Sequence, residues 1–402
     1  MKDNCGKAEN KNPWRLVVIL VGAGVVSAFQ VGKVPPLLPD IQAELVISLF
    51  YAGWILSIFN ITGLVLGTFT GAIADTIGHR RLLIFGIALQ ALASFAGSFS
   101  SSFNILLITR LFEGMGFISV IVSAPTLIFQ VVKEKDAEVA LSMWSCYLPA
   151  GASLIMFFIP FVSRFTDWRG AWKINSLLLI FYLILLINST SGITPFKRKN
   201  KLSIKSFTND IKATLTSAGP VLLSLIFTTY ALQWLAVMGF LPTLLIEKFE
   251  FSKQIASSLT AIMVGVNIIG NLAGGRLLKY GIKRWFLIAF ASFIMGCCSL
   301  AIYSDTNFFI NYSGCILFSL IGGLIPASVL GGSPVYAPSE RLISTTTGML
   351  IQGGQSGQVF GPIILAWIVS TTNTWNSGSW FLGCIAVLGI LFSLGLAKLK
   401  IE

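Results

Sequence analysis

The amino-acid sequence predicts an all-α membrane protein with twelve transmembrane helices in two related halves. Of its 402 residues, 55% are hydrophobic and only 11% are charged, and the mean hydropathy is +0.82. Soluble domains carry roughly 25% charged residues, so this composition excludes an ordinary soluble enzyme. The apolar runs are close to the ~20 residues that cross a hydrocarbon layer, and we predict that each is a membrane span.

Six predicted spans precede the one long polar connection of the chain, and six follow it. In chain order, the spans are 14–38, 47–73, 80–99, 103–131, 138–163 and 168–189, then 217–246, 253–278, 284–303, 308–336, 342–371 and 375–398. The connections between them carry most of the Lys and Arg, because charge is costly in hydrocarbon. We predict two pseudo-symmetric six-helix bundles, at 1–189 and 217–402, joined by a basic linker at 190–216.

The distribution of cations predicts the orientation of the chain. With an even number of spans both termini share one side, and that side carries Lys2, Lys7, Lys11, Arg15, Arg80, Arg81, Lys133, Lys135, Lys197, Arg198, Lys199, Lys201, Lys205, Lys212, Arg276, Lys279, Lys283, Arg284, Arg341, Lys398 and Lys400. The opposite side holds the smaller set Arg164, Arg169, Lys173, Lys248 and Lys253. Lys and Arg are retained in the cytoplasm during insertion, so we expect both termini there and the protein in the inner (plasma) membrane. Membrane lipids, including anionic ones, are expected partners.

A short motif occurs at equivalent places in the two halves. Gly71-Ala-Ile-Ala-Asp75-Thr-Ile-Gly78-His-Arg80-Arg81 is echoed 203 residues later by Gly274-Gly-Arg-Leu-Leu278-Lys-Tyr-Gly281-Ile-Lys283-Arg284. Such an echo in an apolar chain indicates two homologous membrane halves. The first copy resembles the loop signature of the major facilitator superfamily, whose members are secondary transporters. The resemblance implies a twelve-helix fold that works by alternating access around a midplane cavity.

The first copy of the motif is a predicted gating loop, and its candidate residues are Gly71, Asp75, Gly78, Arg80 and Arg81. Gly71 permits close helix approach, and Gly78 permits a turn with positive φ. The two arginines would hold the loop at the anionic inner surface. The resemblance implies that Asp75 latches this side by contacting the start of the eleventh span, near Ser344, Thr345, Thr346 and Thr347. The alternative is a turn that sets topology and has no gating role.

Three charged residues lie inside predicted spans, where each costs roughly 2.5 to 3.5 kcal/mol unless it is paired or solvated. Lys33 lies towards the outer end of the first span, next to Gln30 and two prolines, and Arg110 and Glu113 lie on the fourth span. All three are expected at a similar depth and could meet in one cavity. The two cations exceed the one acid, which favours a docking point for a carboxylate or another anion.

The segment from Arg110 to Gly114 resembles the fourth-helix Arg-x-x-x-Gly pattern of the superfamily. The resemblance implies a role of Arg110 in substrate binding or proton coupling. Glu113 is the one evident protonatable acid in the core and is the candidate for proton coupling. The simpler alternative is an isolated Arg110–Glu113 pair at spacing i, i+3, with Lys33 snorkelling outwards.

Neutral polar residues complete the predicted substrate site. Amides expected in the core include Asn60, Gln130, Asn175, Gln233, Asn267, Asn271, Gln352, Gln355 and Gln358, and aromatic candidates for cavity walls are Trp144, Tyr147, Tyr230 and Trp234. Gln352, Gln355 and Gln358 recur every third residue among glycines, which favours a moving, substrate-facing segment. Gln352 and Gln355 form the predicted substrate-binding set together with Lys33, Arg110, Gln30 and Gln233. Bonds between neighbouring helices are the alternative role for the amides.

Other chemistries find no support in the sequence. His79 is the one histidine, and the six cysteines lack metal-site spacing, so we expect no metal, no cofactor and no catalytic centre. The cations flank apolar spans and form no basic surface with interleaved aromatics, which argues against nucleic acid. A sensor or membrane enzyme would need a signalling domain or a catalytic cluster, and neither is evident in the sequence.

The sequence thus predicts a secondary active transporter, proton-coupled, for a small organic anion or metabolite. The alternative is a proton-antiport efflux pump for drugs or for a secreted metabolite such as a polycarboxylate. Drug exporters of the superfamily usually carry a fifth-helix Gly-x-x-x-Gly-Pro-x-x-Gly signature, of which only fragments occur between Ser145 and Ser153. The direction of transport is left open.

Overall fold

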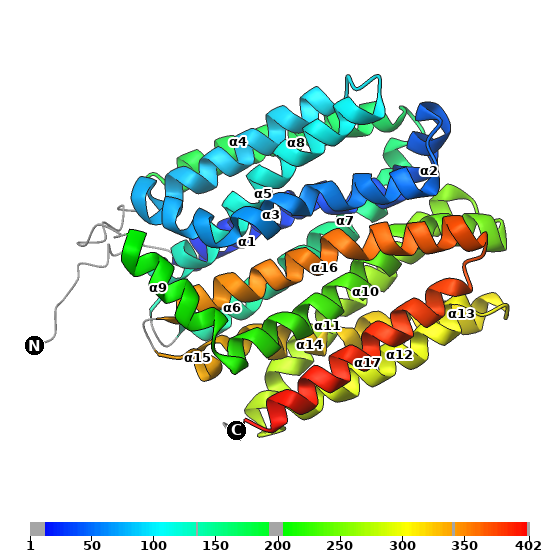
Figure 1. The fold of residues 1–402 in the computed structure, drawn as a ribbon. Coiled ribbons are helices and arrows are strands. Elements are labelled where there is room, and N and C mark those ends of the chain that lie inside the picture. Colours follow the sequence, from blue (N-terminus) through cyan, green and yellow to red (C-terminus); the bar gives the residue numbers. More distant parts are fainter. Residues whose placement is uncertain (1–12, 134–135, 193–203, 340–341, 400–402) are drawn as a thin grey trace, which may run out of the picture.

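The computed structural model describes residues 13–133, 136–192, 204–339 and 342–399, and these residues contain helices and no strand (Figure 1). The first half contains α1 (Pro13–Gly32), α2 (Val34–Leu45), α3 (Leu49–Ile77), α4 (His79–Gly97), α5 (Phe103–Val131), α6 (Ala137–Ser145), α7 (Tyr147–Val162) and α8 (Trp168–Ser189). The second half contains α10 (Ala218–Phe249), α11 (Lys253–Lys279), α12 (Arg284–Tyr303), α13 (Phe308–Gly322), α14 (Leu324–Gly331), α15 (Ser333–Tyr336), α16 (Ile343–Thr372) and α17 (Ser377–Ala397). Between the halves, α9 (Ile204–Leu215) lies within the predicted linker and packs against α10 and α16.

The prediction of a polytopic helical membrane protein is confirmed, with two refinements. Ten helices in the described ranges are long and apolar enough to cross a membrane, and eleven if the bent pair α6 and α7 counts as one span. The predicted span 342–371 corresponds to α16, which has 30 residues but is too rich in Gln, Gly, Ser and Thr to reach the same hydropathy.

Three predicted spans are interrupted. The first breaks at Lys33, two residues before Pro35, and then continues to Leu45. Proline has no backbone N–H to donate, which loosens the helix at this point. The fifth span breaks at Cys146, with an angle of 42° between its two parts, and the tenth breaks at Gly323 and again at Gly332.

The helices form two bundles that meet along extended faces (Figure 1). One joint runs between α3 and α16, and the other between α7 and α11. Small residues permit the close approach: a Cβ atom on Gly53 would lie 3.0 Å from the carbonyl oxygen of Pro362, and one on Gly63 would lie 2.7 Å from Cγ of Gln355. A joint built from glycine and flexible side chains allows two bundles to pack tightly and still shift against each other.

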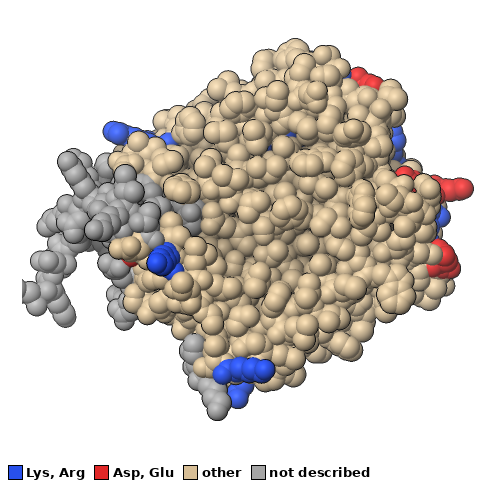
Figure 2. Space-filling view, in the orientation of Figure 1, with Lys and Arg blue, Asp and Glu red and all other residues tan. Residues whose placement is uncertain are grey.

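The two ends of the molecule differ in charge. The described chain begins and ends near one end, which we call the terminal end, and α2 lies at the opposite end (Figure 1). Figure 2 shows a wide uncharged belt between the ends, with acidic side chains gathered mainly at the opposite end. Large apolar side chains on the belt are exposed, among them Leu92, Leu177, Phe181, Phe293 and Leu391. A belt of this kind is what contact with lipid tails requires.

Candidate functional site

The structure brings the three predicted core charges together inside the first bundle. Glu113 on α5 accepts a hydrogen bond from Lys33 Nζ on one carboxylate oxygen, at 2.7 Å, and one from Arg110 Nη1 on the other. The side chains of Lys33, Arg110 and Glu113 are 0–1% exposed. The alternative expectation that Lys33 snorkels outwards is wrong, because Glu113 and two further acceptors hold the ammonium group inside. We call these three residues the charge triad.

The break between α1 and α2 places Lys33 where three helices can contact it. Its ammonium group donates to Oε1 of Gln30 at 2.5 Å and to Oγ of Ser94 on α4 at 3.0 Å. The same nitrogen lies 4.2 Å from the centre of the Trp172 ring on α8. A lysine without water is stable only when acceptors and an aromatic face replace its hydration. The sequence had identified Gln30, but it gave no reason to choose Ser94 or Trp172.

Arg110 is held just as closely. Its guanidinium donates to the backbone oxygen of Gln30 at 2.8 Å and to that of Ile55 on α3 at 3.4 Å. Its central carbon lies 4.5 Å from the centre of the Phe59 ring. Gly114 makes this arrangement possible, because a Cβ atom there would come within 1.9 Å of the Phe59 carbonyl oxygen. The glycine of the fourth-helix pattern therefore allows α3 to lie directly against the arginine.

The charge triad carries a net charge of +1 in an apolar surrounding, and unpartnered donors lie around it. Within the described residues, Nε2 of Gln30 and Nε1 of Trp172, whose side chains both contact Lys33, are buried without a hydrogen-bond partner. Buried polar groups are nearly always hydrogen-bonded to protein, water or ligand. Excess positive charge together with free N–H groups is suited to an anion.

The predicted amides of the second bundle contact helices instead of the charge triad in this conformation. Gln352 donates to the backbone oxygen of Leu64 on α3 at 3.2 Å, and Gln355 packs against Gly63. Gln233 donates to the backbone oxygen of Thr229 in its own helix at 3.1 Å. Gln352 and Gln355 therefore form part of the joint between the bundles.

A separate polar network lies inside the second bundle. Asn267 donates to Oη of Tyr230 at 3.1 Å and to the backbone oxygen of Ser319 at 2.8 Å, and Asn271 donates to Oδ1 of Asn267 at 2.8 Å. Nε1 of Trp234 donates to Oγ of Ser319 at 3.4 Å. None of these side chains is charged, in contrast to the charge triad of the first bundle.

The gating loop has the predicted turn. Gly78 has a φ of +94°, so the positive φ expected there is confirmed, and its counterpart Gly281 has a φ of +85°. Arg80 donates to Oγ1 of Thr190 at 3.0 Å and to the backbone oxygen of Ile187 at 3.2 Å, and so ties the loop to the end of α8. Arg81 is exposed.

The contacts predicted for the rest of this loop are less complete. A Cβ atom on Gly71 would meet no described atom within 4 Å, so the expected close helix approach is absent at this position. The side chain of Asp75 lies outside the described residues, and its latch stays a prediction. Of its expected partners, Thr347 shares a hydrogen bond with Ser333 at 2.5 Å, and the hydroxyl of Thr346 is buried without a partner in the described part of the chain.

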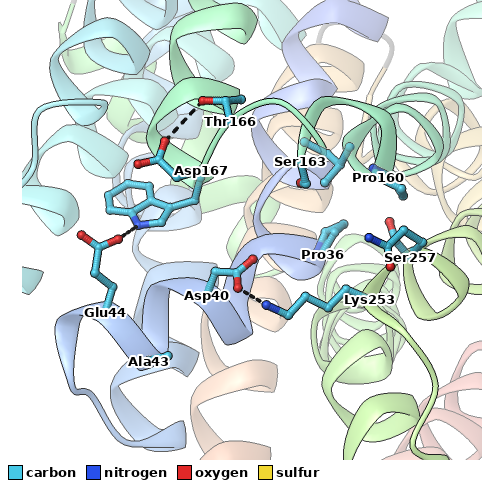
Figure 3. Close-up of a pocket in the computed structure, with 13 residues that line it drawn as sticks. Pro36, Asp40, Ala43, Glu44, Pro160, Ser163, Thr166, Asp167, Lys253 and Ser257 are labelled. Atoms are coloured by element: carbon cyan, nitrogen blue, oxygen red, sulfur yellow. Dashed lines mark hydrogen bonds and ion pairs between the residues drawn. The ribbon is translucent and has the colours of Figure 1, made fainter.

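At the opposite end, a cavity of about 640 Å³ lies between α2, α7, α8 and α11 (Figure 3). Lys253 on α11 pairs with Asp40 on α2 and so joins the two bundles. Glu44 accepts a hydrogen bond from Nε1 of Trp168 at 2.6 Å and pairs with Arg169. The Asp40–Lys253 pair therefore joins the two bundles at this end of the molecule, whereas the contacts of Glu44 lie within the first bundle.

Two bundles of membrane-spanning helices, the first of which contains a buried charge cluster, form the architecture of a polytopic membrane transporter. A sequence profile of the Major Facilitator Superfamily matches residues 20–347, and the chain belongs to this family.

Several proteins that resemble this chain are named as transporters. The chain is 23% identical to the 3-(3-hydroxy-phenyl)propionate transporter of Escherichia coli K12, over 78% of this chain and 76% of the relative. It is 26% identical to the multidrug resistance protein MdtL of Vibrio parahaemolyticus, over 82% of each. The fold matches the crystal structure of a bacterial homolog of the human lysosomal transporter Spinster, with a TM-score of 0.79 and 14% identity, over 97% of this chain and 99% of the other.

Proposed function

We propose that the protein is a proton-coupled secondary transporter that moves a small organic anion across the inner membrane by alternating access. The observation that carries this proposal is the way in which two buried cations, Lys33 and Arg110, bind the two oxygens of the Glu113 carboxylate. We call the position of this carboxylate between the two cations the anion seat. A seat that holds a protein carboxylate fits the carboxylate of a substrate equally well. The predicted set Gln30, Gln233, Gln352 and Gln355 would supply neutral hydrogen bonds at stages when the bundles have moved.

Glu113 would couple substrate binding to proton uptake by releasing Lys33 and Arg110 when it is protonated. While it is ionised, it neutralises one of the two cations and blocks the seat. When it takes up a proton, it loses its attraction to Lys33 and Arg110, and two buried cations are left without a counter-ion. Such an arrangement is costly, so an entering anion is favoured at that moment. Because one proton and one monoanion enter together, the net charge of the core stays at +1.

The contact regions between the bundles, α3 with α16 and α7 with α11, would allow the bundles to move against each other during such a cycle. We propose that the terminal end faces the cytoplasm, as the cation distribution predicts, and that Asp75 latches that end in part of the cycle. The Asp40–Lys253 pair would close the outer end. The Gln352–Leu64 contact crosses the joint between α3 and α16 through a single flexible side chain, so it is suited to break and re-form.

The relatives support the substrate class in a general way. The named substrate of the Escherichia coli relative is a carboxylate, as the proposed seat requires. At 23% identity this supports an organic acid as substrate and does not select one.

The test is a thermal-stability screen of the purified protein, followed by uptake into proteoliposomes under an imposed pH gradient. A ligand that binds the native state raises stability by RT ln(1 + [L]/Kd). We expect carboxylates to stabilise the wild type and not Lys33→Ala, and we expect the same carboxylates to accumulate when the proton gradient is inward. Equal stabilisation of both proteins would contradict the anion seat.

Efflux of drugs by proton antiport is the second candidate, and the similarity to a multidrug resistance protein favours it. Lipophilic cations fit poorly next to a cluster with a net charge of +1. Stabilisation by cationic compounds alone, without any effect of carboxylates, would replace the anion proposal by this one.

A further inference from the structure

A row of aromatic rings leads away from the charge triad. Phe59 lies under Arg110, its ring centre is 5.0 Å from that of Phe117, and Phe117 lies 6.3 Å from Tyr147. Tyr147 is stacked on Trp144 at 4.5 Å with an angle of 22° between the ring planes. The row therefore joins α3, α5, α7 and α6, and it starts at one of the two cations of the anion seat.

The far end of the row lies at a bend. Tyr147 is the first residue of α7, directly after the break at Cys146, and it is partly exposed, whereas Phe59 and Phe117 are buried. Gly24 on α1 faces the end of the row, since a Cβ atom there would lie 2.6 Å from the Trp144 ring. The rings at the bend can thus be approached by a ligand and can move when the angle between α6 and α7 changes.

The seat and the row have a fixed spacing. Glu113 and Phe117 are four residues apart on α5, so they lie on one face, with Cβ atoms about 5–6 Å apart. A ligand whose carboxylate replaced that of Glu113 would place its next atoms beside the Phe117 ring. A planar ring on a short linker would then stack in the row, in the way that aromatic pairs do at ring-centre distances of about 4.5 to 7 Å.

We infer that the substrate is a monocarboxylate that carries an aromatic ring, with the carboxylate between Lys33 and Arg110 and the ring against Phe117 and Tyr147. The inference rests on the proposed anion transport and names its substrate class. Phe117 and Tyr147 would select the aromatic ring, and the charge triad would select the charge of the ligand. We specify a single carboxylate because the two oxygens of one carboxylate, as in Glu113, occupy both cations.

The test compares 3-phenylpropionate with 3-cyclohexylpropionate, which has the same carboxylate and linker but no π system, by titration calorimetry on the full-length protein. We expect the wild type to bind the phenyl compound about tenfold more tightly, as one aromatic pair allows. The preference should vanish in Tyr147→Leu and Phe117→Leu and survive in Tyr147→Trp. Phe112→Leu is the matched control, because Phe112 lies on the same helix but is 44% exposed.

Failure of the inference is distinguishable from failure of the proposed function. If both acids bind equally and both require Lys33, the aromatic class is wrong and anion transport stands. If Tyr147→Leu and Phe117→Leu keep the preference, the assignment of these two residues to the ring is wrong. If neither these acids nor other carboxylates bind, both the class and the proposed function are wrong. If Tyr147→Leu loses all binding because it does not fold, the test relies on Tyr147→Trp, which keeps a ring at this position.

Discussion

At the scale of single residues, the charge triad defines what each side chain contributes. Lys33 and Arg110 each hold one oxygen of Glu113, so removal of either cation leaves one carboxylate oxygen without its partner while the other cation still neutralises the acid. Breaking a buried pair by removing one partner typically costs about 3–5 kcal/mol. The roles of the two cations and of the acid can therefore be separated by substitution.

Removal of either cation should weaken anion binding. Hydrogen bonds to charged groups contribute about 1.5–3 kcal/mol each, so we expect Lys33→Ala and Arg110→Ala to raise the Kd for a carboxylate roughly 10- to 100-fold. Binding is measured by calorimetry on protein that elutes as a folded species. Lys173→Ala is the control, because Lys173 follows Trp172 directly on α8 but is exposed. Wild-type affinity in both core variants would refute the anion seat.

Replacement of the acid should uncouple transport from protons. Glu113→Gln removes the negative charge while it keeps the shape, so the seat should be open to anions at any pH. We expect tighter carboxylate binding, and uptake into proteoliposomes that no longer responds to the pH gradient. Glu44→Gln, a change at an exposed acid, should respond like the wild type. A full response to the gradient in Glu113→Gln would place proton coupling elsewhere.

At the scale of helices, glycines decide how closely the elements approach. The carbonyl oxygen of Phe59 leaves no room for a Cβ atom on Gly114, so Gly114→Ala must push α3 away from α5 and from Arg110. Overpacking of this kind costs about 1–3 kcal/mol. We expect a melting temperature lower by several degrees and weaker carboxylate binding. Gly383→Ala is the matched control, because no described atom lies within 4 Å of that site.

At the scale of the whole molecule, the Asp40–Lys253 pair joins the bundles at the opposite end (Figure 3). Both side chains are partly exposed, so the pair contributes only about 0.2–1 kcal/mol, and its loss shifts a conformational equilibrium by about 1.4- to 5-fold. We expect Asp40→Asn to open the cavity at this end. The measurement is the rate at which a membrane-impermeant maleimide labels Ser257→Cys, a buried position that lines the cavity, in a background without the natural cysteines.

The charge swap provides the decisive control for this prediction. Asp40→Lys combined with Lys253→Asp restores the attraction and should return labelling to its original rate. Asp305→Asn breaks an ion pair with Lys248 that lies within the second bundle, so it should leave the rate unchanged. Faster labelling in the swap as well as in Asp40→Asn would show that the pair does not hold this end closed.

Much of the fold followed from the sequence because hydropathy acts locally. A run of about 20 apolar residues forms a transmembrane helix in a bilayer, whatever segments lie beside it in the chain. The positive φ of Gly78 and Gly281 was predictable for the same reason, since a turn of this kind depends on a few residues. The breaks at Cys146 and Gly323 were missed. Pro149 and Pro326 follow them three residues later, but a proline alone does not predict a break, since Pro125 and Pro242 lie within continuous helices.

The sequence by itself determined the membrane class, the repeat, the turn glycines and the identity of the core charges. Only the tertiary structure decided that Lys33 meets Glu113, 80 residues away, and that Ser94, Trp172 and Phe59 surround the pair. It also decided that Gln352 and Gln355 pack against α3 in this conformation. The physical reason is that the composition of a segment fixes its own helix, whereas contacts between helices depend on which faces pack together and how closely their small residues let them approach.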